Sequence, residues 1–265
     1  MSTLRRTGAL TALLATGLTS VALAATITGT DGNDQLVGTP QADQISGLGG
    51  EDFIIGRGGD DHLLGGDDDD TIAGDGTCPP GATNTTYCST SGDGDEDGND
   101  DIEGGGGDDN IDGNGGKDRV DGARGQDRIR GSGGNDDLRG DAGGDDIRGG
   151  TGNDRIRGGT GGDALRSESG NDTVVGESGN DTVVGGTGND RLSGGSGRDG
   201  ISGGAGSDRI SGGAGVDRLS GGSGNDRIFS RDGVTDSITC GSGRDRVNAD
   251  RRDTVSRDCE RVRRR

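Results

Sequence analysis

The sequence has very few aromatic residues. It contains no tryptophan, and Phe53, Tyr87 and Phe229 are the only aromatic residues among 265. Hydrophobic residues make up only 24% of the chain, which is too little for an ordinary globular core. From composition alone we would expect a disordered chain. The lack of aromatic side chains also leaves almost no platform on which nucleic-acid bases or sugars could stack.

Basic residues are scarce relative to acidic ones. The chain has 28 Lys and Arg against 48 Asp and Glu, a net charge of −20 at pH 7. Such a chain repels a phosphate backbone, so we expect no nucleic-acid partner. His62 is the only histidine, and neither an HExxH zinc motif nor a GxSxG motif in a strand-turn-helix context occurs. We therefore expect that the protein is not an enzyme.

Glycine and aspartate are abundant and recur with a period of nine. The repeated phrase is clearest in GGTGNDRLS (185–193), GGAGSDRIS (203–211) and GGSGNDRIF (221–229). Its aspartates form a block of fifteen units and a shorter block of five, and an aliphatic residue follows each one two positions later. The repeat aspartates are Asp34, Asp43, Asp52, Asp61, Asp70, Asp100, Asp109, Asp118, Asp127, Asp136, Asp145, Asp154, Asp163, Asp172, Asp181, Asp190, Asp199, Asp208, Asp217 and Asp226.

Each unit divides into a turn and a strand. The first six residues are rich in glycine, which accepts the positive φ angles of tight turns. The last three, such as Arg191-Leu192-Ser193, alternate polar, apolar and polar, which predicts a very short strand with one inward side chain. Two such strands would bury two aliphatic residues back to back. We therefore predict a coil of two repeats, or eighteen residues.

Aspartates eighteen residues apart would then lie above one another in two columns. In the long block, one column runs from Asp100 to Asp226 and the other from Asp109 to Asp217. At a coil spacing of about 4.8 Å, two carboxylates repel by about 0.9 kcal/mol even in water. Ca²⁺ suits such columns because it takes several oxygen ligands, and glycine-rich turns expose their carbonyls. We predict that all twenty repeat aspartates bind multiple Ca²⁺ ions.

This pattern resembles the GGxGxDxUx nonapeptide of the RTX, or haemolysin-type, calcium-binding family. The resemblance implies an all-β fold, a right-handed parallel β-roll (β-solenoid) with two repeats in each coil. It also implies that each ion lies between Asp carboxylates of successive turns on one edge, together with turn carbonyls. The alternative is a Gly-Asp-rich tract that never folds, but low complexity alone does not place an aliphatic residue in every unit.

The chain divides into five segments. Residues 1–24 are predicted to be a secretory signal peptide, with Arg5 and Arg6 before a short apolar stretch and an Ala22-Leu23-Ala24 cleavage site. We therefore expect a secreted, extracellular protein with no transmembrane segment after cleavage. A first repeat block follows at 25–73, an acidic insertion at 74–97, the main repeat block at 98–229, and a C-terminal cap with a basic tail at 230–265.

The insertion and the cap each contain two cysteines. Four cysteines allow three pairings. In an exported chain we predict the two local disulfides, Cys78–Cys88 and Cys240–Cys259, because local pairs cost least in loop closure. The insertion ends in a DxDxDG string over Asp93–Asp97 that resembles the first half of an EF-hand loop; it is either a further calcium site or an acidic lead-in. The apolar residues expected to pack the cap are Ile238, Val247, Val255 and Val262.

Arginines at outward-facing strand positions suggest a partner for the protein. Arginine follows the aliphatic residue in five consecutive units, which predicts two short ladders on opposite faces. These arginines are Arg130, Arg139, Arg148, Arg157 and Arg166. They either bind an acidic glycan or lipopolysaccharide, or they offset acidic charge and discourage edge-to-edge association.

The sequence therefore supports two functions. The first is a secreted calcium-ion-binding repeat protein that folds on binding Ca²⁺. The alternative is a calcium-dependent surface adhesin or extracellular matrix scaffold, whose partner would be a cell-surface or extracellular glycan. An ice-binding roll would need a regular Thr/Asn ladder, whereas the outward positions here mix Arg, Asp, Thr and Ser.

Overall fold

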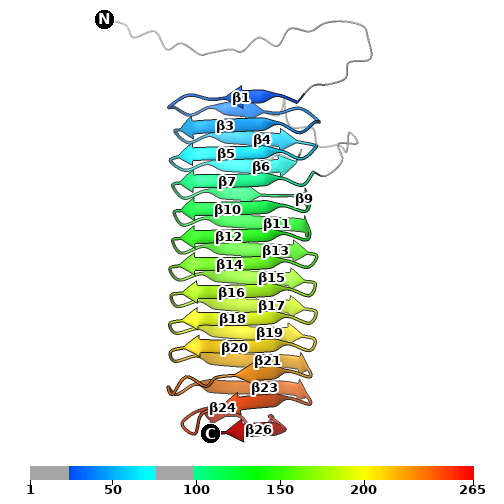
Figure 1. Ribbon diagram of the computed structural model, residues 1–265, viewed down its shortest axis with the longest axis vertical. Helices are drawn as coiled ribbons and strands as arrows, with labels where there is room; N and C mark the ends of the chain where they lie inside the picture. The colour runs from blue at the N-terminus through cyan, green and yellow to red at the C-terminus, as the bar shows by residue number, and fades with distance from the viewer. Residues whose placement is uncertain (1–23, 76–97) are drawn as a thin grey trace, which may run out of the picture.

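The computed structural model describes residues 24–75 and 98–265. Every helix or strand in these two ranges is a β-strand, from β1 to β26 (Figure 1). The predicted Cys78–Cys88 pair, the acidic string at Asp93–Asp97 and residues 1–23 of the predicted signal peptide lie outside the described residues. Within 24–75 and 98–265, no helix is long and apolar enough to cross a membrane.

The strands form two parallel sheets, in which each strand pairs with one from the next coil. The first sheet contains β1 (Thr26–Thr28), β3 (Gln44–Gly49), β5 (His62–Asp67), β7 (Asp101–Gly106), β10 (Arg119–Arg124), β12 (Asp137–Ala142), β14 (Arg155–Thr160), β16 (Thr173–Ser178), β18 (Arg191–Ser196), β20 (Arg209–Ala214), β22 (Arg227–Phe229), β24 (Arg246–Ala249) and β26 (Arg261–Arg264). The second sheet contains β2 (Gln35–Val37), β4 (Phe53–Arg57), β6 (Thr71–Asp75), β8 (Asn110–Asp112), β9 (Gly115–Gly116), β11 (Arg128–Gly134), β13 (Asp146–Thr151), β15 (Ala164–Ser169), β17 (Thr182–Thr187), β19 (Gly200–Ala205), β21 (Arg218–Gly224), β23 (Ser237–Gly243) and β25 (Thr254–Val255).

The pairing register confirms a coil of two repeats. In the first sheet Arg191 of β18 pairs with Arg209 of β20, and in the second sheet Arg128 of β11 pairs with Asp146 of β13. Both pairs are eighteen residues apart. Successive strands run in opposite directions on the two sides of the roll, and the coils stack along one axis (Figure 1). The fold is therefore the predicted parallel β-solenoid.

The core is a double row of the repeat aliphatic residues. Leu36, close to the N-terminal end, is 8% exposed, and every other residue of this set is at most 3% exposed. Ile147 of the second sheet and Ile156 of the first are both fully buried. Each buried side chain of this kind contributes about 1.5–3 kcal/mol. A thin core is therefore spread evenly along the roll.

The strands are longer than the sequence predicts. The expected three-residue strand at Arg191-Leu192-Ser193 extends to Ser196, because the following glycines stay in register and Gly195 pairs with Gly213. The prediction of a six-residue turn was wrong for this reason. At Gly152, φ is 133°, and a β-carbon would collide with the carbonyl oxygen of Gly134 in the coil before it. The closeness of the coils therefore fixes glycine at this turn position.

The two repeat blocks form one continuous roll. Across the insertion, β5 pairs with β7 and β6 pairs with β8, so that His62 lies beside Asp101 and Thr71 beside Asn110. Gly74 lies against the Asp100 carboxylate, as the glycine five residues before an aspartate does in other repeats. The roll therefore continues from β5 and β6 to β7 and β8 in the register of an ordinary repeat, although residues 76–100 separate β6 from β7 in the sequence.

The predicted cap is built from the same two sheets, which continue through β23, β24, β25 and β26. Ile238 and Val247 are buried and Val255 packs against them. Val262 was predicted to pack as well, but it is 40% exposed because β26 is the last strand of its sheet and no coil covers it. The predicted Cys240–Cys259 disulfide is confirmed, with a Cα–Cα distance of 5.1 Å.

Candidate metal sites

The repeat aspartates lie in two columns, one along each edge of the roll. In both columns the backbone N–H of each aspartate donates to Oδ1 of the aspartate in the next coil, at 2.7–3.1 Å. The first column contains Asp43, Asp61, Asp100, Asp118, Asp136, Asp154, Asp172, Asp190, Asp208, Asp226 and Asp245. The second contains Asp34, Asp52, Asp70, Asp109, Asp127, Asp145, Asp163, Asp181, Asp199, Asp217, Asp236 and Asp253.

The second carboxylate oxygen has no protein partner in most of these residues. Oδ2 is buried and accepts no hydrogen bond in eighteen of the twenty predicted ligands, and also in Asp236 and Asp245. A buried carboxylate oxygen without a partner is costly unless a donor or a cation reaches it. Both columns therefore present a row of oxygens suited to a cation.

In most repeats a backbone carbonyl lies near the same space as this oxygen. At Gly149, a β-carbon would collide with Oδ2 of Asp154 and would lie 2.9 Å from the carbonyl oxygen of Ser167 in the next coil. The same arrangement recurs at Gly131 with Asp136 and the carbonyl of Gly149. The missing side chain leaves a small space lined by a carboxylate oxygen and a carbonyl oxygen, which are ligand types that Ca²⁺ prefers.

Burial also raises the pKa of aspartates inside the columns. Desolvation is the largest cause in Asp118, Asp61 and Asp109, and it raises their pKa values to about 9, about 8 and about 7. The N–H donated to Oδ1 opposes this shift, while neighbouring carboxylates of the column raise the pKa further. The pKa of Asp154, in the middle of the roll, is raised to about 6 by the same causes. A bound cation would reverse these shifts by stabilising the charged form.

Side chains alone do not form a complete metal cage. No group of three or more His, Cys, Asp or Glu side chains able to hold a metal ion occurs in the part of the chain that the structure describes. An ion in either column would therefore need backbone carbonyls as well as carboxylates. That requirement favours Ca²⁺, which tolerates many oxygen ligands in flexible geometry, over Mg²⁺, which demands an octahedron.

The ends of the columns differ from their middle. Asp34 and Asp43 are in the columns as predicted, but their Oδ2 atoms accept the backbone N–H groups of Thr30 and Thr39. At the other end, Oδ2 of Asp253 accepts the hydroxyl of Ser230 at 2.9 Å. The oxygens without partners therefore lie between these terminal units.

Three members of the columns were not predicted from the sequence: Asp236, Asp245 and Asp253. The spacing is ten residues from Asp226 to Asp236, nine to Asp245 and eight to Asp253, so a strict nine-residue period counted from Asp100 excluded all three. The usable signal was the aliphatic residue two positions after each one, at Ile238, Val247 and Val255.

The predicted arginine ladders are present. Arg130, Arg148 and Arg166 pair in register on the second sheet, and Arg139 pairs with Arg157 on the first. Ion pairs with aspartates of the same faces neutralise them in part, including Arg157–Asp137 at 3.3 Å and Arg166–Asp146 at 2.8 Å. This pairing fits the charge-offset role better than a binding role.

A comparison with protein families matches the chain to the RTX calcium-binding nonapeptide repeat (4 copies). The matched segments are residues 28–63, 46–76, 96–129, 117–146, 130–165, 139–174, 166–201 and 202–234. The chain belongs to this family. RTX repeats of this kind bind calcium, and the protein is accordingly a calcium-binding repeat protein. No curated protein matches the chain.

Proposed function

We propose that this RTX protein is secreted and that its roll folds when Ca²⁺ enters the two aspartate columns. The observation that carries the proposal is the row of buried Oδ2 atoms without a partner, most of which share a glycine space with a backbone carbonyl. An ion that binds only the folded coil adds its binding free energy to folding. The thin aliphatic core gives little stability of its own, so calcium would decide whether the chain folds.

The aspartates proposed to bind Ca²⁺ are those from Asp52 to Asp226 whose Oδ2 atom has no partner. Asp236 and Asp245 extend the columns and join this set. Each ion would take Oδ2 from a repeat aspartate and a carbonyl oxygen from the coil that follows. The predicted signal peptide supports secretion, and extracellular calcium would then supply the ions.

The test is far-UV circular dichroism of the mature chain, first in excess chelator and then across a calcium titration from micromolar to millimolar. We expect a largely unfolded spectrum without calcium and a cooperative gain of β-structure with it. Magnesium at the same concentrations is the control and should have little effect. A full β-spectrum in chelator, or an equal response to magnesium, would contradict the proposal.

A further inference from the structure

The C-terminal half of the first sheet carries a second arginine ladder on its outer face. Five successive strands, β18, β20, β22, β24 and β26, each place an arginine at their first position, and all five are exposed. Consecutive members are direct register partners along the sheet. This arginine strip consists of Arg191, Arg209, Arg227, Arg246 and Arg261.

The carboxylates of the described residues leave this strip unpaired. Among residues 24–75 and 98–265, none of its five guanidinium groups forms an ion pair, whereas upstream on the same sheet Arg119 binds Asp101 at 2.8 Å. The outward residues two positions after the arginines contain no acid. They are Ser193, Ser211, Phe229, Asn248 and Arg263. Like charges on neighbouring strands repel one another, so an anion from outside the chain would stabilise this face.

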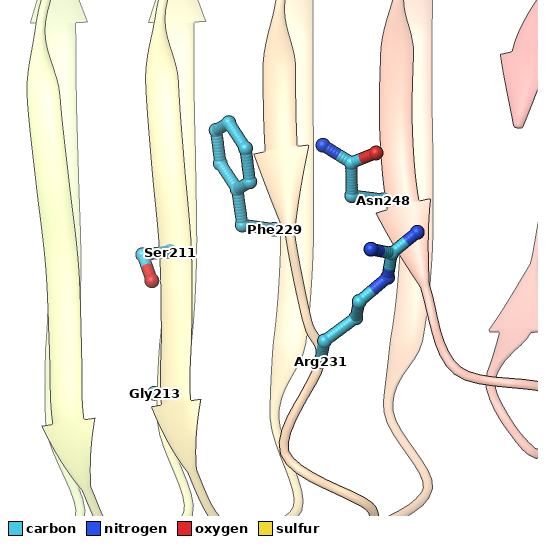
Figure 2. A pocket seen from close by; sticks show the side chains of 5 residues that line it. All are labelled: Ser211, Gly213, Phe229, Arg231 and Asn248. Carbon is cyan, nitrogen blue, oxygen red and sulfur yellow. The ribbon is translucent and has the colours of Figure 1, made fainter. Parts of the chain in front are cut away.

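A hollow of about 390 Å³ lies beside the strip, and Figure 2 shows the residues that line it. Phe229 forms one wall, and the guanidinium of Arg209 lies 4.2 Å from the centre of its ring. Arg231 lies at the hollow, where its Nε and Nη2 donate to the carbonyls of Ala249 and Arg263 at 3.4 and 3.2 Å. Ser211 and Asn248 add hydrogen-bonding groups to the lining.

We propose that the arginine strip binds an extended acidic polysaccharide that carries a carboxylate on each sugar and lies along the roll axis. Neighbouring arginines are spaced like neighbouring strands, about 4.8 Å apart, and a pyranose ring spans a similar length. Guanidinium groups bind carboxylates through paired hydrogen bonds. Ser211, Asn248 and the face of Phe229 provide contacts for hydroxyl groups and for one sugar ring.

A nucleic acid fits this face less well. Stacked phosphates on one strand repeat at about 3.4 Å, which does not match the strand spacing. Phe229 is also the only aromatic residue beside the arginine strip, so nucleic-acid bases would have a single side chain on which to stack. The inference rests on the proposed function, because the strip exists only in the folded roll.

The experiment measures binding of a short oligogalacturonate to the full mature chain by calorimetry at a fixed calcium concentration. The test variant carries Arg191→Gln, Arg209→Gln and Arg227→Gln. The matched control carries Arg130→Gln, Arg148→Gln and Arg166→Gln, which removes the same three charges from a register ladder on the other sheet. We expect affinity to fall more than tenfold in the test variant and less than threefold in the control, and wild-type affinity to fall as salt is raised.

Circular dichroism of the same samples separates this proposal from the previous one. Wild-type protein that folds with calcium but does not bind oligogalacturonate above the level of neutral dextran would overturn the polysaccharide proposal alone. An equal loss in both triple variants would also overturn it. If the triple variant does not fold, the single variants Arg209→Gln and Arg148→Gln replace the triples, with an expected loss of at least threefold in the first only.

Two further measurements exclude other partners. Tighter binding of oligothymidylate than of oligogalacturonate, with the same dependence on the strip, would assign the face to nucleic acid and reject the proposal. Sedimentation equilibrium that shows a wild-type dimer and a monomeric test variant would assign it to a second copy of this chain instead.

Discussion

Each repeat aspartate uses its two carboxylate oxygens differently. In Asp154, Oδ1 accepts the backbone N–H of Asp136 at 3.0 Å and so holds two coils together. Oδ2 has no protein partner and lies beside the carbonyl of Ser167. One oxygen therefore serves the fold of the chain, and the other is available to an ion. A substitution that changes only the second can separate the two roles.

Asp154→Asn is such a substitution, because it keeps an acceptor at Oδ1 and replaces Oδ2 with an amide that can donate to Ser167. We expect about one bound Ca²⁺ to be lost and its neighbours at Asp136 and Asp172 to bind more weakly. Without calcium, the equilibrium should shift towards the folded roll, because a desolvated charge is removed. Equilibrium calcium binding and the β-content in excess chelator measure the two effects.

Glu177→Gln is the control for this prediction, since it removes the same charge from an exposed side chain. It should leave both calcium stoichiometry and stability close to wild type. An equal weakening of sites at Asp145 and Asp163, on the opposite edge, would argue against two independent columns.

Gly149→Ala tests the space beside the carboxylate. A β-carbon at this position would collide with Asp154 Oδ2 and crowd the carbonyl of Ser167, and such overpacking costs about 1–3 kcal/mol. We expect lower calcium affinity and a lower thermal midpoint. Gly200→Ala is the matched control, because the nearest atom to its β-carbon would be 4.0 Å away. Equal thermal midpoints for the two variants would show that the space is not needed.

At the level of the elements, the columns couple stability to pH. In the folded, calcium-free roll, burial raises aspartate pKa values from 3.8 to about 8 for Asp61 and about 9 for Asp118. The folded state therefore binds more protons than the unfolded state in this range, so its stability falls as pH rises from about 4 towards 9. Calcium competes with these protons, and calcium affinity should rise over the same interval.

The measurement is the β-content of calcium-free protein by far-UV circular dichroism at pH 5 and pH 8.5. We expect a largely unfolded chain at pH 8.5 and more β-structure at pH 5. In saturating calcium the difference should shrink or reverse, because bound ions hold the carboxylates in their charged form. A calcium-free β-content that is equal or higher at pH 8.5 would contradict the assigned burial of the columns.

The sequence predicted the coil and the columns because both follow from one period. Two repeats per coil, the buried aliphatic rows and the stacked aspartates need only the nine-residue spacing and the alternation of a strand. The strand ends were not predictable in this way, since Gly194 and Gly195 look like turn residues and pair only because an identical coil lies beside them. The backbone hydrogen bonds to one coil therefore determine the conformation of the next coil.

The arginine strip escaped sequence analysis for a related reason. Arg191, Arg209 and Arg227 are eighteen residues apart, but Arg246 follows after nineteen and Arg261 after fifteen. Only the pairing of β22 with β24 and of β24 with β26 brings them into one row. Similarly, the pairing of Arg157 and Arg166 with aspartates depends on which side chains are adjacent across a sheet.

At the level of the whole molecule, the roll is a stack of nearly equivalent coils whose interactions reach only the adjacent coil. Removal of residues 173–190 deletes one coil and joins Asp172 to Arg191, which restores a normal repeat. We expect this variant to keep its calcium-induced β-spectrum and to bind about two fewer ions. Circular dichroism and calcium stoichiometry provide the measurement.

A deletion of thirteen residues, 173–185, is the control for this prediction. It leaves only residues 186–189 between Asp172 and Asp190, too few for a strand and a turn, so these two aspartates cannot take successive positions in the roll. We expect a large loss of calcium-induced structure in this variant. Equal folding of the two deletions would show that the columns do not depend on register.

The disulfide between Cys240 and Cys259 makes the C-terminal end of the roll more resistant to a pulling force than the N-terminal end. A force that pulls the N-terminus away from the stack would peel coils one at a time, because each is held only by its neighbour. Within the main repeat block every step would release eighteen residues, or about 60 Å of extended chain, and the coil that carries the insertion would release more. The crosslink ties β23 to the segment before β26, so the final coils resist after the others have yielded. Under tension the main repeat block would lengthen as a series of equal steps, and the extension would end at a covalent stop.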